Sequence, residues 1–177
     1  MPGSIRENDQ FVRHFVQAND INLVLDIGPG QGTYSDLLTD IVSDLDAVEA
    51  WEPYVGTYDL RSKYGLLWVE DAREWLKKQT VRGEWDKFEK YDLIIFGDVL
   101  EHMSEEESIV AWKNASLIAR WGLISVPIVH YPQGAEGGNP FEVHVQDHLT
   151  PEHIRATFGP FDSEALYPWT GTFIKEF

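Results

Sequence analysis

The chain has 177 residues with no cysteine, and its 30 acidic side chains outnumber 14 basic ones, giving a formal charge of −16. The lack of cysteine excludes a disulfide framework, a zinc–thiolate site and a thiol nucleophile. The negative charge argues against nucleic acid, which is bound through Lys and Arg at phosphates. We expect one domain over residues 1–177, cytoplasmic, with no membrane span and no signal peptide.

Apolar residues recur with helix or strand periodicity along the chain. The N-terminal segment, residues 1–20, is predicted to hold an amphipathic helix at 8–19. Short runs rich in branched apolar residues predict strands at 23–27, 47–51, 66–69, 91–96 and 123–128. Helical spacing predicts helices between them, at 33–42, 54–64, 71–79 and from 104 to about 121.

Start and stop signals mark several of these elements. Ser104 and Glu107 form a capping-box pattern, and so do Asp71 and Glu74. Thr150 and the proline after it predict the start of a last helix, which ends at residue 158. Strand-like runs at 161–167 and 172–177 flank a Pro-Trp-Thr-Gly turn and predict a hairpin.

Alternating strands and helices predict an α/β fold: a doubly wound, seven-stranded, mostly parallel sheet with helices on both faces. The hairpin adds an antiparallel edge, whose outer strand could pair with a second copy, so a homodimer stays open. Ligands of such sheets bind at the carboxyl ends of the strands, near the switch in strand order. Residues directly after the strands are therefore the candidates for a site.

A glycine-rich turn follows the first strand, with the sequence DIGPGQG at residues 26–32. Its G-x-G-x-G spacing differs from the dinucleotide fingerprint, and it lacks the Gly-Lys of a phosphate-binding loop. No Lys or Arg occurs between Arg13 and Arg61. The turn therefore favours a cationic ligand bearing an adenosine over a pyrophosphate, the simpler alternative being a tight turn with no ligand.

Acidic residues follow the next three predicted strands. Glu52 is placed at the end of the second strand, where a carboxylate can accept both hydroxyls of a ribose. Asp71 follows the third strand and Asp98 the fourth. Glu52 could instead be a solvated acid, and Asp71 could simply cap the next helix.

Together these residues resemble the class I S-adenosylmethionine (SAM)-dependent methyltransferases. The resemblance rests on VLDIGPGQG at 24–32, on EAWEP at 49–53, on Asp71–Ala72 and on FGDVLEHM at 96–103, which is similar to the DVLEH segment of members that modify small molecules and glycans. Pro29 departs from the small residue that is commoner there. The resemblance implies SAM as cofactor and the strand order 3-2-1-4-5-7-6.

The resemblance also implies roles for individual residues. Asp26 and the glycines Gly28, Gly30 and Gly32 would hold the methionine end and the sulfonium. Glu52 would hold the ribose, and Asp71 with Ala72 the adenine. Asp98 would face the cofactor near the methyl group that is transferred.

Histidines are the candidates for handling the acceptor's proton, because transfer to a hydroxyl or amine is helped by a general base. His102 lies beside Asp98 in the sequence, and His144 follows a loop rich in Gly and Pro. We expect residues 128–149 to line the acceptor site. His144 and His148 would suit a metal only on a helix, which their surroundings do not favour, so we assign no metal.

The chain holds little beyond the seven-strand core and lacks an inserted cap domain. We therefore expect a methyltransferase acting on a small-molecule, sugar or glycan acceptor. One alternative is a catalytically silent SAM-binding regulatory subunit, and another is an NAD-dependent dehydrogenase, which the glycine spacing opposes. A nucleic-acid or protein methyltransferase would need a basic face, which only residues 61–120 could supply.

Overall fold

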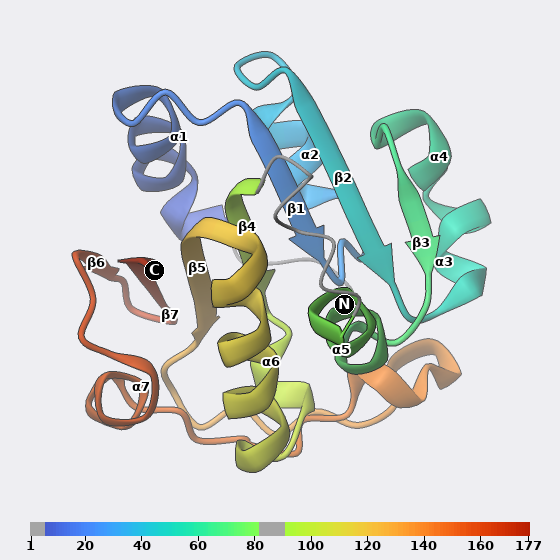
Figure 1. Ribbon diagram of the computed structural model, residues 1–177. Helices are drawn as coiled ribbons and strands as arrows, with labels where there is room; N and C mark the ends of the chain where they lie inside the picture. The colour runs from blue at the N-terminus through green and yellow to red at the C-terminus, as the bar shows by residue number, and fades with distance from the viewer. Residues whose placement is uncertain (1–5, 82–90) are drawn as a thin grey trace.

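The computed structural model describes residues 6–81 and 91–177 (Figure 1). Seven strands form one sheet in the order β3-β2-β1-β4-β5-β7-β6, in which β1 to β5 are parallel and β7 runs antiparallel to both β5 and β6. This confirms the predicted fold class and strand order. The strands are β1 (Leu23–Ile27), β2 (Asp44–Glu49), β3 (Leu67–Val69), β4 (Tyr91–Gly97), β5 (Ala119–Pro127), β6 (Ser163–Leu166) and β7 (Thr170–Glu176).

Helices cover both faces of the sheet (Figure 1). One apolar cluster joins the sheet to α5, α6 and α7, and a second joins its other face to α1, α2 and α4. The described helices are α1 (Asp9–Ala18), α2 (Thr33–Leu38), α3 (Glu52–Thr57), α4 (Leu60–Lys63), α5 (Ala72–Val81), α6 (Glu105–Ile118) and α7 (Pro151–Phe158). Short 3₁₀ turns are η1 (Arg6–Asn8), η3 (Leu100–His102), η4 (Glu136–Gly138) and η5 (Pro140–Glu142).

The central strands place apolar side chains on both faces, as buried parallel strands do. Leu25 and Ile27 of β1 belong to the cluster beneath α5 and α6, whereas Val24 belongs to the cluster beneath α1 and α2. Asp26 points to the same side as Val24 because successive side chains of a strand alternate. This alternation puts a carboxylate into the core directly before the glycine turn.

Several predicted boundaries are wrong: the helix predicted at 33–42 ends at Leu38, and the second strand begins at Asp44 instead of residue 47. The second strand ends at Glu49, not at residue 51, and Glu52 begins α3. Helix α6 ends at Ile118 and β5 begins with the next residue, so Gly122 lies inside β5 rather than at the end of the helix. A Cβ on Gly122 would lie 2.4 Å from ring atoms of Trp112 and Phe177. That glycine reflects close packing between distant segments, which is why it misleads as a helix-end signal.

Predicted helix starts agree better with the structure. Ser104 and Glu107 exchange both hydrogen bonds of a capping box at the start of α6. The Thr150 hydroxyl accepts from the backbone N–H of His153 at 3.2 Å, with Pro151 in the first turn of α7. The helix predicted at 54–64 is divided into α3 and α4 at Asp59, which has a positive φ of 50°.

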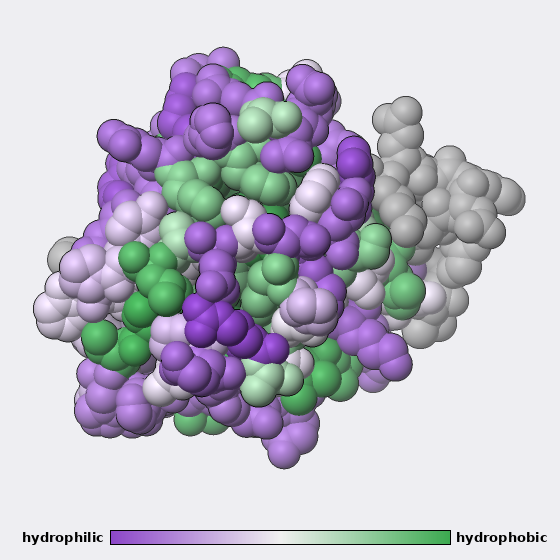
Figure 2. Space-filling view, turned by 90° about the vertical axis from the view of Figure 1, so that its left-hand side faces the viewer, coloured by the Kyte–Doolittle hydropathy of each residue, from purple (hydrophilic) through white to green (hydrophobic). Residues whose placement is uncertain are grey.

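Figure 2 shows the face on the left of Figure 1, where β6 forms the edge of the sheet. Hydrophilic side chains separate the hydrophobic patches on this face, and Leu166 and Trp169 are about half exposed. Across the described residues, no helix has the length and apolar character needed to span a membrane.

Candidate cofactor and acceptor site

A cavity lies at the carboxyl ends of β1 to β4, where the arrowheads of β1, β2 and β3 point in Figure 1. It encloses about 620 Å³ of space, open solvent at its mouth included. Its walls come from residues that follow these four strands and from residues 139–142 of a loop after β5. The parallel topology therefore brings together segments that are far apart in the sequence.

The glycine turn forms one wall. Gly28 and Gly30 line the cavity with positive φ angles of 64° and 54°. A Cβ on Gly28 would approach Val99 Cγ2 to 2.8 Å, so this position has neither the conformation nor the space for a side chain. Gly32, with a φ of 87°, precedes α2 and is not part of the cavity lining.

Asp26 lies beneath this turn and is fully buried, outside the cavity lining. Its Oδ2 accepts a hydrogen bond of 2.6 Å from the Tyr64 hydroxyl, and its Oδ1 has no hydrogen-bond partner within residues 6–81 and 91–177. Burial raises the pKa of Asp26 to about 7, the Tyr64 hydrogen bond opposes the shift, and the nearby Glu49 adds to it.

Glu49, not Glu52, is the acid at the end of β2 that lines the cavity. Its Oε1 accepts from the backbone N–H of Trp51 at 2.7 Å, and its Oε2 from that of Gly30 at 3.3 Å. Burial raises the pKa of Glu49 to about 7, although these backbone N–H groups oppose the shift. Glu52 is exposed in the first turn of α3 and is absent from the lining.

Asp71 and Ala72 both line the cavity, at the turn between β3 and α5. Asp71 accepts from the backbone N–H of Arg73 at 2.9 Å and holds the Arg73 guanidinium, which lowers the pKa of Asp71. Arg73 also pairs with Glu107 of α6. Capping and cavity lining, weighed as alternatives for Asp71, thus coexist.

The turn after β4 supplies the far wall. Asp98 lines the cavity and has a positive φ of 53°, and its backbone N–H donates to Ser125 at 2.8 Å. The 3₁₀ turn η3 follows, and its His102 also lines the cavity. Glu101, between them in this turn, is 1% exposed. No local pattern marks Glu101, because its side chain meets its surroundings only in the folded chain.

His144 reaches this turn from the loop between β5 and α7. The backbone N–H groups of Val145 and Gln146 both donate to the Glu101 carbonyl at 2.9 Å, which fixes the loop against η3. The His102 and His144 rings have centroids 4.8 Å apart. His144 itself does not line the cavity, and His148 instead contacts the His130 ring.

The same loop crosses to the cofactor side of the cavity. Glu142 Oε1 accepts a hydrogen bond of 3.1 Å from the Tyr54 hydroxyl of α3, and both residues line the cavity. Neither Tyr54 nor Glu142 is among the site residues predicted from the sequence. Their contact spans 88 residues, so no local pattern marks it.

The cavity lining is acidic: it contains four carboxylates and one basic residue, Arg73. This agrees with the cationic ligand inferred from the sequence. One correction applies, because the glycine turn does not lack a cation. Lys63 of α4 donates to the Gln31 carbonyl at 3.0 Å and pairs with Asp36, and it does not line the cavity.

Among known proteins, only solved structures match this chain. No protein-family model and no curated protein matches the sequence. Among solved structures, magnesium protoporphyrin IX methyltransferase (ChlM) from Synechocystis PCC 6803 with bound S-adenosylhomocysteine (SAH) is 18% identical, with a TM-score of 0.66 over 96% of this chain and 81% of that one. A SAM-dependent methyltransferase from Archaeoglobus fulgidus is 15% identical, with a TM-score of 0.65 over 95% and 92% of the two chains.

The N-terminal domain of EvdMO1, solved with SAH bound, is also similar, at 11% identity and a TM-score of 0.65 over 98% of this chain and 82% of that one. At such low sequence identities the similarity indicates a shared fold and not a shared function. Together with the strand order, these matches lead to one conclusion. The chain has the fold of the class I SAM-dependent methyltransferases.

Proposed function

We propose that this protein is a SAM-dependent methyltransferase that transfers a methyl group to a hydroxyl or amine of a small-molecule, sugar or glycan acceptor. The observation that carries the proposal is the cavity lined by Gly28, Gly30, Glu49 and the turn from Asp98 to His102. It combines a glycine cradle, a strand-end acid and a histidine at the one place where the fold meets ligands.

The residues present fit SAM in charge and in shape. Glu49 is positioned to accept the ribose hydroxyls, and we propose it for this role in place of Glu52. We assign the methionine end and the sulfonium to the neighbourhood of Asp26, which is buried behind the glycine turn with an oxygen that has no partner in the described residues; the positive sulfonium would favour its ionised form. Gly32 shapes the turn from outside the cavity.

We assign the adenine end to Asp71 and Ala72, which line the cavity after β3. Because Arg73 occupies the Asp71 carboxylate, we expect the backbone at Ala72 to contribute polar contacts to the adenine. Asp98 stands between this cofactor surface and η3, where the methyl group would be presented.

SAM supplies a methyl group on a sulfonium, which leaves as a neutral thioether. The protein then has to align the acceptor with the methyl group and exclude water. His102 borders the cavity at the acceptor end, with His144 next to it, and burial lowers the pKa of both imidazoles. Neutral imidazoles at this place suit the handling of an acceptor proton near neutral pH.

The similar structures do not narrow the chemical class of the acceptor. ChlM is named for magnesium protoporphyrin IX, whereas the EvdMO1 domain was also solved in the presence of SAH and D-fucose. We favour a small or sugar-like acceptor because the cavity is acidic and because Asn139, Phe141 and Glu142, from the loop after β5, contribute to its wall. A phosphate-rich acceptor would be repelled by the same carboxylates.

Calorimetric titration with SAM, SAH and NADH tests the cofactor assignment. We expect SAM and SAH to bind once per chain and NADH not to bind. Glu49→Ala should weaken SAM binding by roughly 100-fold, because hydrogen bonds to a carboxylate contribute about 1.5–3 kcal/mol. Glu52→Ala, which removes a nearby exposed acid, is the matched control and should change affinity less than about twofold.

No SAM binding by the wild type would refute the proposal. If Glu52→Ala weakens SAM binding and Glu49→Ala does not, Glu52 and not Glu49 binds the ribose. Formation of SAH is then measured with panels of hydroxyl and amine acceptors. SAM binding without SAH formation from any acceptor would favour the silent regulatory subunit.

A further inference from the structure

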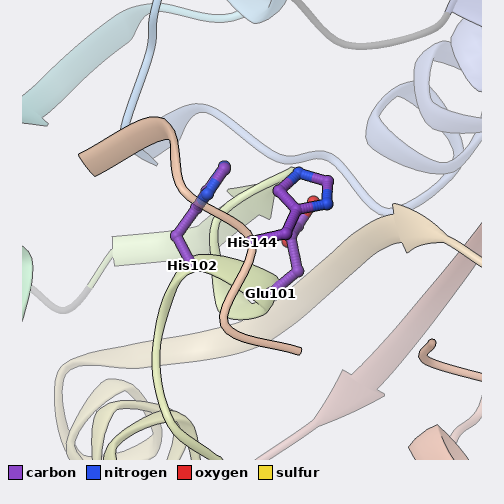
Figure 3. Close-up of side chains that lie close together, drawn as sticks. All are labelled: Glu101, His102 and His144. Atoms are coloured by element: carbon purple, nitrogen blue, oxygen red, sulfur yellow. The ribbon is translucent and has the colours of Figure 1, made fainter. Parts of the chain in front are cut away.

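Three potential metal ligands converge at η3. One donor atom from each of Glu101, His102 and His144 lies within 4.8 Å of the other two. Figure 3 shows the His144 ring in front of the Glu101 carboxylate and the His102 ring beside them. Two of the ligands come from the turn after β4, and the third comes from the loop that crosses it.

The Glu101 carboxylate is what makes this cluster unusual. Both of its oxygens are buried, and neither has a hydrogen-bond partner within the described part of the chain. A buried carboxyl group with no partner costs several kcal/mol unless something compensates it. Asp98 and Glu142 bring further negative charge close to Glu101. A cation would relieve both the burial and the repulsion.

Both histidines are oriented as ligands commonly are. His102 Nδ1 lies 3.1 Å from the Val143 carbonyl, and His144 Nδ1 lies 2.6 Å from the Tyr131 carbonyl. A carbonyl only accepts, so each Nδ1 carries the proton and each Nε2 carries a lone pair. A backbone carbonyl that fixes the second nitrogen in this way is a frequent outer partner of a metal-bound histidine.

We propose that Glu101, His102 and His144 bind one divalent first-row transition cation, such as Mn²⁺, Co²⁺ or Zn²⁺. Two imidazole nitrogens and one carboxylate suit these ions, whereas Mg²⁺ and Ca²⁺ prefer oxygen ligands throughout. Donors on neighbouring positions of a cation with ~2.1 Å bonds lie ~3 Å apart, so side-chain rotation must draw this set inward by ~1–2 Å.

The role of the cation rests on the proposed function. Three protein ligands leave open positions, and because His102 borders the cavity these positions face the acceptor end. An acceptor hydroxyl bound there would lose its proton to water more readily. The oxygen then bonds to the methyl carbon while the carbon–sulfur bond breaks. Within this scheme His102 and His144 are ligands rather than bases, and an oxygen acceptor is preferred to an amine.

The test is direct metal binding by untagged protein, stripped with chelator and titrated with MnCl₂ or CoCl₂ without SAM or acceptor. Bound Mn²⁺ is counted from the loss of the free-ion signal in electron paramagnetic resonance, and ligand geometry is read from the visible absorption of Co²⁺. We expect one ion per chain. Glu101→Gln and His144→Ala should each weaken binding at least about 100-fold, since each removes a direct ligand, whereas lost outer partners cost 10–100-fold.

His148→Ala is the matched control: His148 is an exposed histidine of the same loop, outside the cluster, and its removal should leave metal affinity unchanged. Circular dichroism checks that each variant folds, and His144→Ala carries the test if Glu101→Gln does not fold. Absence of stoichiometric binding by the wild type overturns the proposal, as does unchanged affinity in either ligand variant.

The two proposals fail in different ways. If metal binds but SAM does not, the metal site stands and the methyltransferase assignment falls. If SAM binds and the chelated protein methylates an acceptor at full rate, the cation has no part in the reaction. We expect chelation to abolish turnover while the affinity for SAM stays within about twofold of its original value. Added Mn²⁺ should then restore turnover.

Discussion

Two buried glutamates, one at the end of β2 and one in η3, are held in different ways. Glu49 lines the cavity and accepts two backbone N–H groups, one of them from the glycine turn. Glu101 has no hydrogen-bond partner in the described residues and faces two histidines. The first arrangement suits a neutral ligand that donates hydrogen bonds, such as a ribose, and the second suits a cation.

The largest expected effect concerns Asp26, the second buried acid on the cofactor side. Its folded-state pKa of about 7 exceeds the ordinary value of 3.8, so the folded state binds the proton more tightly. Its contribution to stability is therefore full below pH ~4 and is lost as pH rises towards 7. At 1.36 kcal/mol per pH unit, wild type should lose about 3 kcal/mol from this group between pH 5 and pH 8.

Asp26→Asn should remove that loss. Its free energy of unfolding, measured in urea, should therefore rise relative to that of the wild type as pH increases. Asp36→Asn, at an exposed carboxylate, is the control and should follow the wild type. If the stability difference between Asp26→Asn and wild type is the same at pH 5 and pH 8, the buried charge does not have the effect assigned to it.

Substituting leucine for each glutamate compares the two sides directly. In metal-free protein, Glu101→Leu should raise the free energy of unfolding by about 1–2 kcal/mol, because it removes an unpartnered buried carboxyl group. Glu49→Leu should lower it by about 1–2 kcal/mol, because it leaves the N–H groups of Gly30 and Trp51 without an acceptor. Thermal melts of the chelated proteins measure both changes in stability. If the two substitutions shift stability in the same direction, Glu49 and Glu101 are not held in different ways.

The smallest effect concerns two glycines, one in the glycine turn and one in the loop after β5. Gly28→Ala should destabilise the fold by about 1–2 kcal/mol and weaken SAM binding, because of its positive φ and the 2.8 Å approach to Val99. Gly134→Ala, in the loop after β5, meets nothing within 4 Å and should stay within about 0.5 kcal/mol of wild type. Equal costs would show that the glycine turn is no more constrained than the loop.

Sequence patterns could predict the cofactor side better than the acceptor side. Strand and helix periodicity, with the family resemblance, gave the sheet order and led to the turns after β1, β3 and β4. The end of the second strand was predicted two residues too late, at residue 51, because the sequence offers an acid at both Glu49 and Glu52. The pairing of β2 with β3, in which Glu49 opposite Val69 is the last paired residue, places the strand end at Glu49.

The acceptor side depends on contacts that no local pattern records. His102 and His144 are both candidates in the sequence. Glu101 joins them only because the loop that carries His144 passes over η3. Likewise, the role of Gly122 became clear only from the packing of Trp112 and Phe177 in the structure. Side chains joined across tens of residues contribute to a site through tertiary structure alone.

The loop after β5 also affects the order in which the site can form. The Gly30–Glu49 and Tyr64–Asp26 hydrogen bonds span 19 and 38 residues, whereas the Tyr54–Glu142 bond spans 88. Contacts between distant residues close larger loops and tend to form later in folding. During synthesis, Asp26, Glu49 and Asp98 all emerge before the loop residues that complete the cavity. We therefore expect a nascent chain to assemble the cofactor surface first and to become competent for acceptors only when this loop docks.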